Sequence, residues 1–372
     1  MTTTTPTTSI PAVRELSQPA ALTYPHLGVR RMVLVALVLG LLAAFALSLA
    51  VGSVNIPLHE IITILTGGEA TRAAWSSIIL NFRLPKALTA LLAGAALSVS
   101  GVQMQTLFRN PLADPYVLGI SSGASLGVAL VILAAGTTGS VLLAGLGLLG
   151  DFGLAAAAAF GAAVVLALVL LVARRVQSVV TLLILGLMFG YVTGALVSLL
   201  MYFSIADHVQ IYLSWTFGSF GGVTWNQMRV FAPAIIGGLV IALMLVKPLN
   251  ALLLGETYAR SLGVNVRQLR RWLILSTALL AGAVTAFCGP IGFLGIAVPH
   301  LCRGIFGTSD HRTLIPASIL LGGMVALLAD WVAQVPGSQI ILPLNAITAL
   351  LGAPVVIWII LRRRSLRASL NG

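Results

Sequence analysis

Apolar segments long enough to cross a lipid bilayer recur along almost the whole chain. A bilayer core requires about 20 consecutive apolar residues in a helix, and such runs, with allowance for tilt, follow one another from residue 32 to residue 361. No polar gap of domain size separates them, 59% of the residues are hydrophobic and only 8% are charged. The chain is therefore expected to be an all-α, polytopic membrane protein with a single membrane domain.

Ten membrane-spanning helices are predicted from these runs. They lie near residues 32–52, 84–107, 115–136, 155–173, 178–202, 228–247, 270–288, 291–306, 313–334 and 344–361. Two places stay open. Ser140–Gly150 fits either a re-entrant piece or the start of a long fourth helix, and the eighth span is short enough to be partly buried in protein.

The basic residues indicate the orientation of the spans. Ten spans place both termini on one side, and a cytoplasmic N-terminus puts 17 of the 21 Lys and Arg residues in cytoplasmic segments. Cytoplasmic loops of membrane proteins carry such an excess, so both termini are expected to be cytoplasmic. The net charge of +12 then follows from topology, and no nucleic-acid partner is expected.

The same pattern predicts the domain organisation. Residues 1–29 are polar and contain proline, which favours a disordered cytoplasmic tail. Residues 30–364 are expected to form the transmembrane domain, with a cytoplasmic loop at 250–268, and residues 365–372 a second cytoplasmic tail. The first apolar run is too long for a signal-peptide core and is interpreted as an uncleaved anchor.

One motif in the chain is typical of soluble hydrolases. The pattern G-x-S-x-G surrounds Ser121, but a hydrolase would need a strand before it and a His and an acid nearby in the fold. The segment instead predicts a membrane helix, and the candidate partners His300 and Asp310 belong to other segments. Glycines at four-residue spacing, such as Gly123 and Gly127, favour close helix packing. No catalytic residue is therefore expected.

The residues before that helix predict a stiff corner. Arg109 ends the second span, where a cation complements the helix dipole, and Asn110 with Pro111 interrupts the helix. Asp114 followed by Pro115 has the pattern of an N-cap and a first helical position. A short, rigid cytoplasmic turn is expected here.

Several functional classes lack their signatures in the sequence. Neither lysine follows a glycine, so the chain has no P-loop and ATP hydrolysis would have to come from a partner. His300 and Cys302 have no second ligand pair, which argues against a metal site, and Cys302 and Cys288 are interpreted as packing residues. Asp330, beside Trp331 at an interfacial position, is the clearest acidic residue within a span. This scarcity argues against ion-coupled transport.

The longest cytoplasmic connection, residues 250–268, alternates apolar and charged residues. This pattern predicts a short amphipathic helix and turn on the membrane face, with Gly263 as its C-cap. Two interpretations stay open: a helix that rests on lipid, or a knob that docks into a partner.

Four segments together resemble the permease subunits of type II ATP-binding-cassette importers, which carry iron chelates, haem and cobalamin. They are Arg83–Gly127, Gly255–Val264, Cys288–Arg303 and Leu342–Ile360, in the family's order. The resemblance implies the type II permease fold and a subunit, without its own ATPase site, that imports an iron complex (siderophore or haem) or cobalamin. The alternative is an ATP-independent secondary transporter or channel.

The resemblance also implies partners. A second permease subunit, as a homodimer, two cytosolic ATPase subunits and an extracytoplasmic substrate-binding protein are expected in the lipid of the bacterial cytoplasmic membrane. ATP and Mg would be used by the partner ATPase, and no cofactor or metal would be bound by this chain.

Site residues are carried over from the family's motifs by position. Arg83 and Lys86 match residues that dock the binding protein, although both could also be interfacial anchors. Asn110 and Leu112 match a cytoplasmic gate that closes the inner mouth of the pathway. The stiff corner derived above suits that role.

A second gate and a coupling helix are implied in the same way. The gate includes Val179 and Val180, where relatives often carry hydroxyl residues, so a more apolar constriction is expected. The positions matching the helix that enters the ATPase are Glu256, Ala259, Leu262 and Gly263.

The fifth and eighth spans are expected to border the pathway. Met188, Tyr191 and Met201 offer soft or aromatic surfaces for a large planar or ring-shaped ligand, and their alternative role is to face lipid or pack between helices. A second departure from the family's pattern is Leu344-Asn345, where many relatives have Val-Gly.

Overall fold

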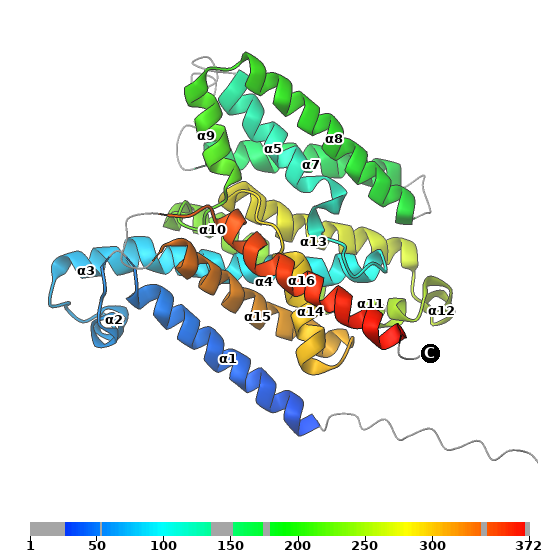
Figure 1. The fold of residues 1–372 in the computed structure, drawn as a ribbon, viewed down its shortest axis with the longest axis horizontal. Helices are drawn as coiled ribbons and strands as arrows, with labels where there is room; N and C mark the ends of the chain where they lie inside the picture. The colour runs from blue at the N-terminus through cyan, green and yellow to red at the C-terminus, as the bar shows by residue number, and fades with distance from the viewer. Residues whose placement is uncertain (1–26, 53, 135–151, 174–178, 336–340, 369–372) are drawn as a thin grey trace, which may run out of the picture.

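The fold is a bundle of helices (Figure 1). The computed structural model describes residues 27–52, 54–134, 152–173, 179–335 and 341–368, and every regular element in these ranges is helical. The α-helices are α1 (Leu27–Ala50), α2 (Leu58–Leu65), α3 (Ala73–Ser77), α4 (Leu84–Leu107), α5 (Ile120–Ala129), α7 (Gly153–Ala173), α8 (Val179–Phe203), α9 (Ala206–Thr216), α10 (Trp225–Met244), α11 (Val246–Leu253), α12 (Glu256–Ser261), α13 (Val266–Cys288), α14 (Leu294–Phe306), α15 (His311–Ala333) and α16 (Leu344–Ala368). Shorter turns are η1 (Ile78–Arg83), η2 (Pro115–Leu118) and η3 (Leu130–Ala134).

Each of the ten predicted spans coincides with a helix in the described ranges. Seven helices are long and apolar enough to cross a membrane, and three shorter apolar helices, in α5, α14 and α16, account for the rest. The chain is a multi-pass membrane protein of the expected all-α class. Ser140–Gly150 and most of the two predicted tails fall outside the described residues.

The second span is longer than predicted. One continuous apolar helix runs from Ala73 to Leu107, through α3, the π-helical η1 and α4. The predicted start after Arg83 was wrong because a basic residue was taken as a boundary. Pro85 donates no backbone N–H, and the widened π-helical turns that precede it let the helix continue.

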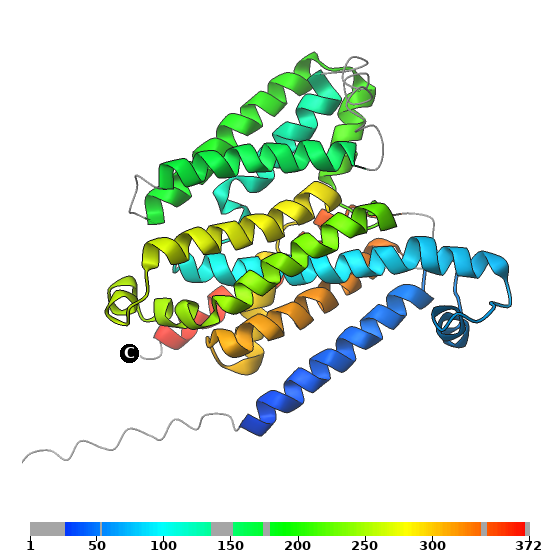
Figure 2. The same ribbon diagram turned by 180° about the vertical axis from the view of Figure 1, so that it is seen from behind.

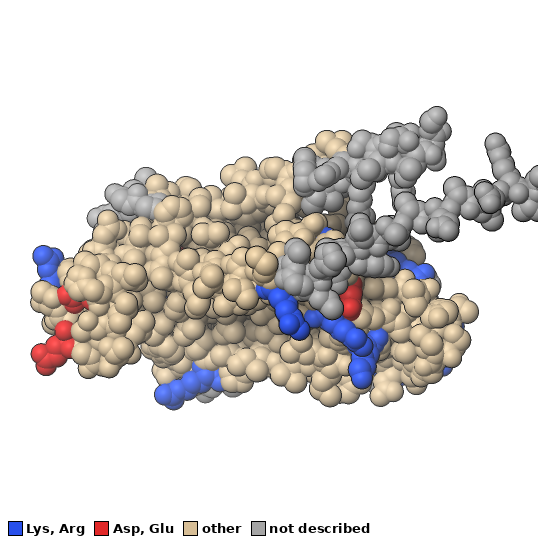
Figure 3. Space-filling model, turned by 90° about the horizontal axis from the view of Figure 1, so that it is seen from below, with Lys and Arg blue, Asp and Glu red and all other residues tan. Residues whose placement is uncertain are grey.

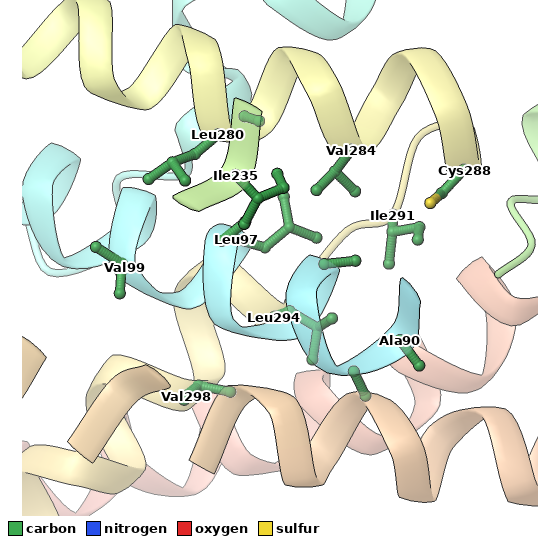
Figure 4. Close-up of a cluster of buried hydrophobic side chains, with 14 of the residues drawn as sticks. Ala90, Leu97, Val99, Ile235, Leu280, Val284, Cys288, Ile291, Leu294 and Val298 are labelled. Carbon is green, nitrogen blue, oxygen red and sulfur yellow. The ribbon is translucent and has the colours of Figure 1, made fainter. Parts of the chain in front are cut away.

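Helix α4 forms the core of the bundle, packed against α10, α13, α14 and α15. Figure 4 shows Leu97 of α4 among apolar side chains that include Ile235 of α10, Leu280 of α13 and Leu294 of α14. Nineteen residues of this 24-residue helix are buried. Because it is shielded on all sides, α4 can carry polar side chains that bond to its neighbours.

Small residues let the helices approach closely. A Cβ placed on Gly101 of α4 would overlap the carbonyl oxygen of Gly295 in α14. A Cβ on Gly123 of α5 would lie 2.5 Å from the carbonyl oxygen of Gly161 in α7, and Gly127 meets the same helix one turn later. The predicted glycine-spaced packing surface is thus confirmed.

The other helices surround this core in two groups. Figures 1 and 2 show α5, α7, α8 and α9 as one layer beside α10 and α13, while α1 lies on the far side against α15. The short α14 has eight buried residues and follows an extended stretch after Gly289, so the eighth span is partly buried in protein, as foreseen. Cys288 and Cys302 are buried free thiols, in agreement with packing roles.

Charged residues occupy little of the surface. Figure 3 shows uncharged atoms over most of one face, with the few Lys, Arg, Asp and Glu side chains in separate clusters. The end of the bundle that carries α11 and α12 is called the inner end below, following the predicted orientation.

Candidate functional site

The chain makes a tight corner between α4 and η2. Arg109 has a φ of 47°, a left-handed conformation that ends the helix, and Asn110 Oδ1 accepts the backbone N–H of Leu112 at 3.0 Å. Asp114 Oδ1 accepts the backbone N–H of Tyr116 at 2.8 Å, which confirms the predicted N-cap. The corner, residues 109–114, is therefore fixed by its own backbone and side-chain bonds.

Helix α14 braces this corner from one side. His300 Nε2 lies 2.8 Å from the carbonyl oxygen of Pro111, and Arg303 donates to Gln105 Oε1 at 2.6 Å. The amide of Gln105 in turn donates to the carbonyl oxygen of Gly295 at 3.2 Å. His300 thus has a structural role, because it fastens α14 to the corner.

His300 and Asp310, the two candidate partners of Ser121, bond to other parts of the described structure. His300 binds the corner, and Asp310 caps α15 by accepting the backbone N–H of Arg312 at 2.9 Å. Asp310 Oδ1 also accepts from the side-chain amide of Asn250 at 2.6 Å. No group of three His, Cys, Asp or Glu residues that could hold a metal occurs within the described ranges.

The predicted coupling loop, residues 250–268, holds the end of α11, the whole of α12 and the first residues of α13 rather than one helix. Helix α11 ends at Leu253, and α12 begins at Glu256 after Gly255, whose φ of 117° no other residue adopts easily. This break was not predicted because the apolar residues continue across it. Gly263, at a φ of 82°, donates to the carbonyl oxygen of Arg260 at 2.9 Å and ends α12 as predicted.

The four predicted coupling residues point in different directions. Glu256 forms ion pairs with Arg260 at 3.1 Å and with Arg270 of α13 at 3.0 Å. Ala259 is fully buried against the protein. Only Leu262 carries a large exposed side chain, at 57%. The first two residues therefore hold α12 in place, whereas Leu262 faces outward.

Sequence reasoning missed two exposed residues of this region. Leu254 and Tyr258 are 65% and 51% exposed and were not distinguished from the apolar residues that anchor the loop. Both line a groove of about 770 Å³ that also includes Arg109, Glu256 and Val180. The groove brings the corner, the coupling loop and one residue of the second predicted gate together at the inner end.

Helix α8 carries the predicted pathway residues and the second gate. Val180 and Tyr191 are 66% and 67% exposed and lie on an apolar face that continues to Tyr202. Met188 is also exposed, whereas Met201 is half-buried and packs against the core. Two of the three predicted pathway side chains thus share an open face, and Met201 does not. The side chain of Val179 lies outside the described residues.

The two predicted docking residues at the outer end have partners within the chain. Lys86 Nζ lies 3.0 Å from Asp330 Oδ1, and Arg83 donates to the carbonyl oxygens of Leu49 at 2.6 Å and Ala50 at 3.1 Å, at the end of α1. Asp330, near the end of α15, is only 4% exposed, and its ion pair with Lys86 permits this burial.

A groove of about 640 Å³ opens above these residues. Its lining includes Arg83, Lys86, Asn81, Asn226 and Gln334. Docking of a binding protein remains a prediction for this surface, and both cations also stabilise the fold.

The unusual Asn345 has a structural reason. Its Oδ1 accepts the backbone N–H of Gly292 at 3.1 Å, and its own N–H donates to the carbonyl oxygen of Phe217 at 3.0 Å. The side chain thus fastens the start of α16 to the extended stretch before α14. A glycine at this position could not make the first bond.

Comparisons with known proteins agree with this arrangement. Residues 40–362 match the model of the FecCD transport family. The chain is 39% identical over 345 residues to the vitamin B12 import system permease protein BtuC of Klebsiella pneumoniae, covering 92% of this chain and 98% of that protein. It is 38% identical over 295 residues to the BtuC of Salmonella typhi, covering 79% and 87% of the two chains.

A solved structure extends the similarity to the fold. An inward-facing conformation of a metal-chelate type ABC transporter superimposes with a TM-score of 0.76 at 31% identity, covering 89% of this chain and 99% of that one.

Proposed function

The chain belongs to the FecCD transport family, and from this membership we propose that it is the permease subunit of an ATP-binding-cassette importer that moves cobalamin or an iron complex into the cell. The observation that carries the proposal is the groove at the inner end. It places the corner, Val180 and α12 around one space. In this groove α12, the proposed contact with the ATPase, and Val180, a residue of the proposed gate, are direct neighbours.

The ATP would be hydrolysed by a partner. The sequence has no P-loop, so two cytosolic ATPase subunits, with Mg, supply the energy. The outward surface of α12, with Tyr258 and Leu262, is the proposed contact with them. Glu256 and Ala259 act from the other side, since they fix α12 to the permease.

The pathway would run beside the exposed face of α8. This apolar face has Val180 at one end and Tyr202 near the other, and in the proposed homodimer it packs against the same face of a second copy instead of lipid. Val180, Asn110 and Leu112 then close the inner mouth. Met188 and Tyr191 would contact the ligand, whereas the half-buried Met201 supports the helix.

The outer groove is the proposed docking surface for the substrate-binding protein. Arg83 and Lys86 give it positive charge, and complementary charge steers such encounters. The chain would lie in the bacterial cytoplasmic membrane with both termini in the cytoplasm. The basic residues support this orientation.

Uptake into proteoliposomes tests the function. The chain, its ATPase and its binding protein are reconstituted, and uptake of radiolabelled cyanocobalamin, a ferric siderophore and haem is compared with and without ATP. We expect ATP-dependent uptake of one class only, with cobalamin favoured by the BtuC similarity. A catalytically inactive ATPase is the control. Uptake that persists with it would instead support a secondary transporter or channel.

A further inference from the structure

A chain of buried hydrogen bonds connects the inner end of α4 to the coupling loop. Thr106 Oγ1 lies 2.9 Å from His311 Nε2, and His311 Nδ1 lies 2.7 Å from Asn250 Oδ1. Thr106 belongs to α4, His311 begins α15, and Asn250 belongs to α11. Thr106 is 4% exposed and His311 is fully buried, so their bond is shielded from water, whereas Asn250 is half-buried.

The partners of Asn250 fix the direction of each bond. Its amide nitrogen donates to Asp310 Oδ1 at 2.6 Å, and its Oδ1 accepts the backbone N–H of His311 at 2.9 Å. Oδ1 is therefore an acceptor, and the ring Nδ1 beside it must carry a proton. In the neutral ring Nε2 is then an acceptor 2.9 Å from the hydroxyl of Thr106, whose single proton is shared between Nε2 and the carbonyl oxygen of Val102 at 2.8 Å. The amide of Asn250 and the ring of His311 thus each have one orientation that fits these partners.

The two ends of this series of hydrogen bonds lie beside the corner and the coupling loop, the parts of the importer that are proposed to move. The carbonyl oxygen of Thr106 accepts the backbone N–H of Arg109 at 3.3 Å, at the start of the corner. Asn250 lies one helical turn before the end of α11, and the carbonyl oxygen of Leu252 accepts the N–H of Gly255 at 3.1 Å. Only two residues separate α11 from α12.

A second contact joins the corner and the coupling loop directly. The guanidinium of Arg109 occupies the space beside Gly255, where a Cβ would lie 2.8 Å from Nη2. Both residues have positive φ angles, 47° and 117°. Gly255, the residue before α12, and Arg109, the first residue of the corner, therefore touch directly.

We propose that Thr106, His311 and Asn250 are positioning residues that transmit movement of α12 to the gate. The inference rests on the proposed function. A short α12 joined to α11 by two residues moves with it, and directed bonds in a low-dielectric interior are stiff and costly to break. Displacement of α11 therefore pulls on His311 and, through it, on the last turn of α4.

The test follows the gate itself, so it does not depend on which ligand is carried. Leu112→Cys provides a thiol for maleimide labelling at a side chain that is 43% exposed, and the native Cys288 and Cys302 are buried. The labelling rate is measured in the complete complex with ATPase, with and without ATP and vanadate. Thr106→Val removes the hydroxyl at nearly constant volume, and Thr106→Ser restores it.

Thr89→Val is the matched control. Thr89 is fully buried in the same helix, and its hydroxyl donates to the carbonyl oxygen of Pro85 one turn earlier. We expect the nucleotide-dependent change in labelling to fall about three- to tenfold in Thr106→Val, and to remain in Thr106→Ser and Thr89→Val. Asn250→Val, in the half-buried α11, should reduce the nucleotide response as Thr106→Val does. It replaces Thr106→Val in the test if Thr106→Val does not fold.

Two outcomes would overturn the inference. One is an unchanged nucleotide response in both Thr106→Val and Asn250→Val, and the other is an equal loss in Thr89→Val. If the labelling rate of a complex that carries Leu112→Cys as its single change does not respond to nucleotide, this result would instead contradict the proposed function.

Discussion

Lys86 Nζ and Asp330 Oδ1 lie 3.0 Å apart and join the outer part of α4 to α15. The side chains are 22% and 6% exposed, and the amide of Gln334 donates to the second carboxylate oxygen at 2.7 Å. The carboxylate is thus bonded on both oxygens. A residue first expected to meet another protein also holds two core helices together.

Removal of this lysine should destabilise the protein. Lys86→Met leaves a buried carboxylate without its counterion, which costs about 3 kcal/mol in free energy of unfolding. The measurement is thermal unfolding in detergent, with Lys247→Met as control because Lys247 is exposed. A second change, Asp330→Asn, should recover part of the loss. Equal melting temperatures for the two lysine variants would refute the role of the pair.

The corner should respond to pH through Asp114. Burial raises the pKa of its carboxyl from 3.8 to about 6, so the folded state binds a proton more tightly than the unfolded state. Stability from this group is therefore greatest at low pH and declines as pH rises from about 4 to 6. Asp114→Asn keeps a capping oxygen and should be at least as stable at pH 7. Melting temperatures from pH 5 to 7 should vary less in this variant, and an unchanged pH profile would argue against the shift.

Close approach of α4 and α14 predicts opposite effects at two glycines. Gly101→Ala would force a Cβ into the carbonyl of Gly295 and should cost about 1–3 kcal/mol. Gly304→Ala, in the exposed part of α14 with open space around it, should be neutral or gain up to about 1 kcal/mol. Thermal unfolding compares them. Similar stability in both variants would show that α14 can shift at little cost.

Exposed Leu262 should contribute to binding of the ATPase. Leu262→Asp is expected to weaken association by about tenfold, measured by titration of the purified ATPase, with little change in melting temperature. Ile62→Asp on α2 is the matched control, because Ile62 is 56% exposed against 57% for Leu262. Glu256→Arg is less selective, since it would also break the ion pair with Arg270. Equal affinity of both aspartate variants would remove Leu262 from the interface.

Local sequence patterns were sufficient wherever one segment contains all the groups that interact. The cap at Asp114 and the end of α12 at Gly263 depend on neighbouring residues, so residue type and spacing predicted both. The apolar runs predicted ten helices because the bilayer requires backbone hydrogen bonds within each segment. The inner boundary of the second span was also predicted, from Arg109 and the residues after it.

Partners distant in sequence could not be predicted in this way. Arg270 lies 14 residues after Glu256, and Asp330 lies more than 200 residues after Lys86. Nothing in a linear pattern distinguishes a lysine that faces another protein from one that binds a carboxylate inside. The direction of Ala259, into the protein, and of Leu262, away from it, likewise depends on where α13 lies.

The sequence by itself determined that this chain crosses the membrane in helices and where its rigid corner lies, because these depend on segment lengths and local bonds. Only the tertiary structure decided which polar residues meet. It brought Thr106, His311 and Asn250 into one chain of hydrogen bonds from three helices and laid Arg109 against Gly255. Such contacts arise when packing of small residues fixes the distances between helices. These distances depend on residues from several helices, so no single segment of the sequence determines them.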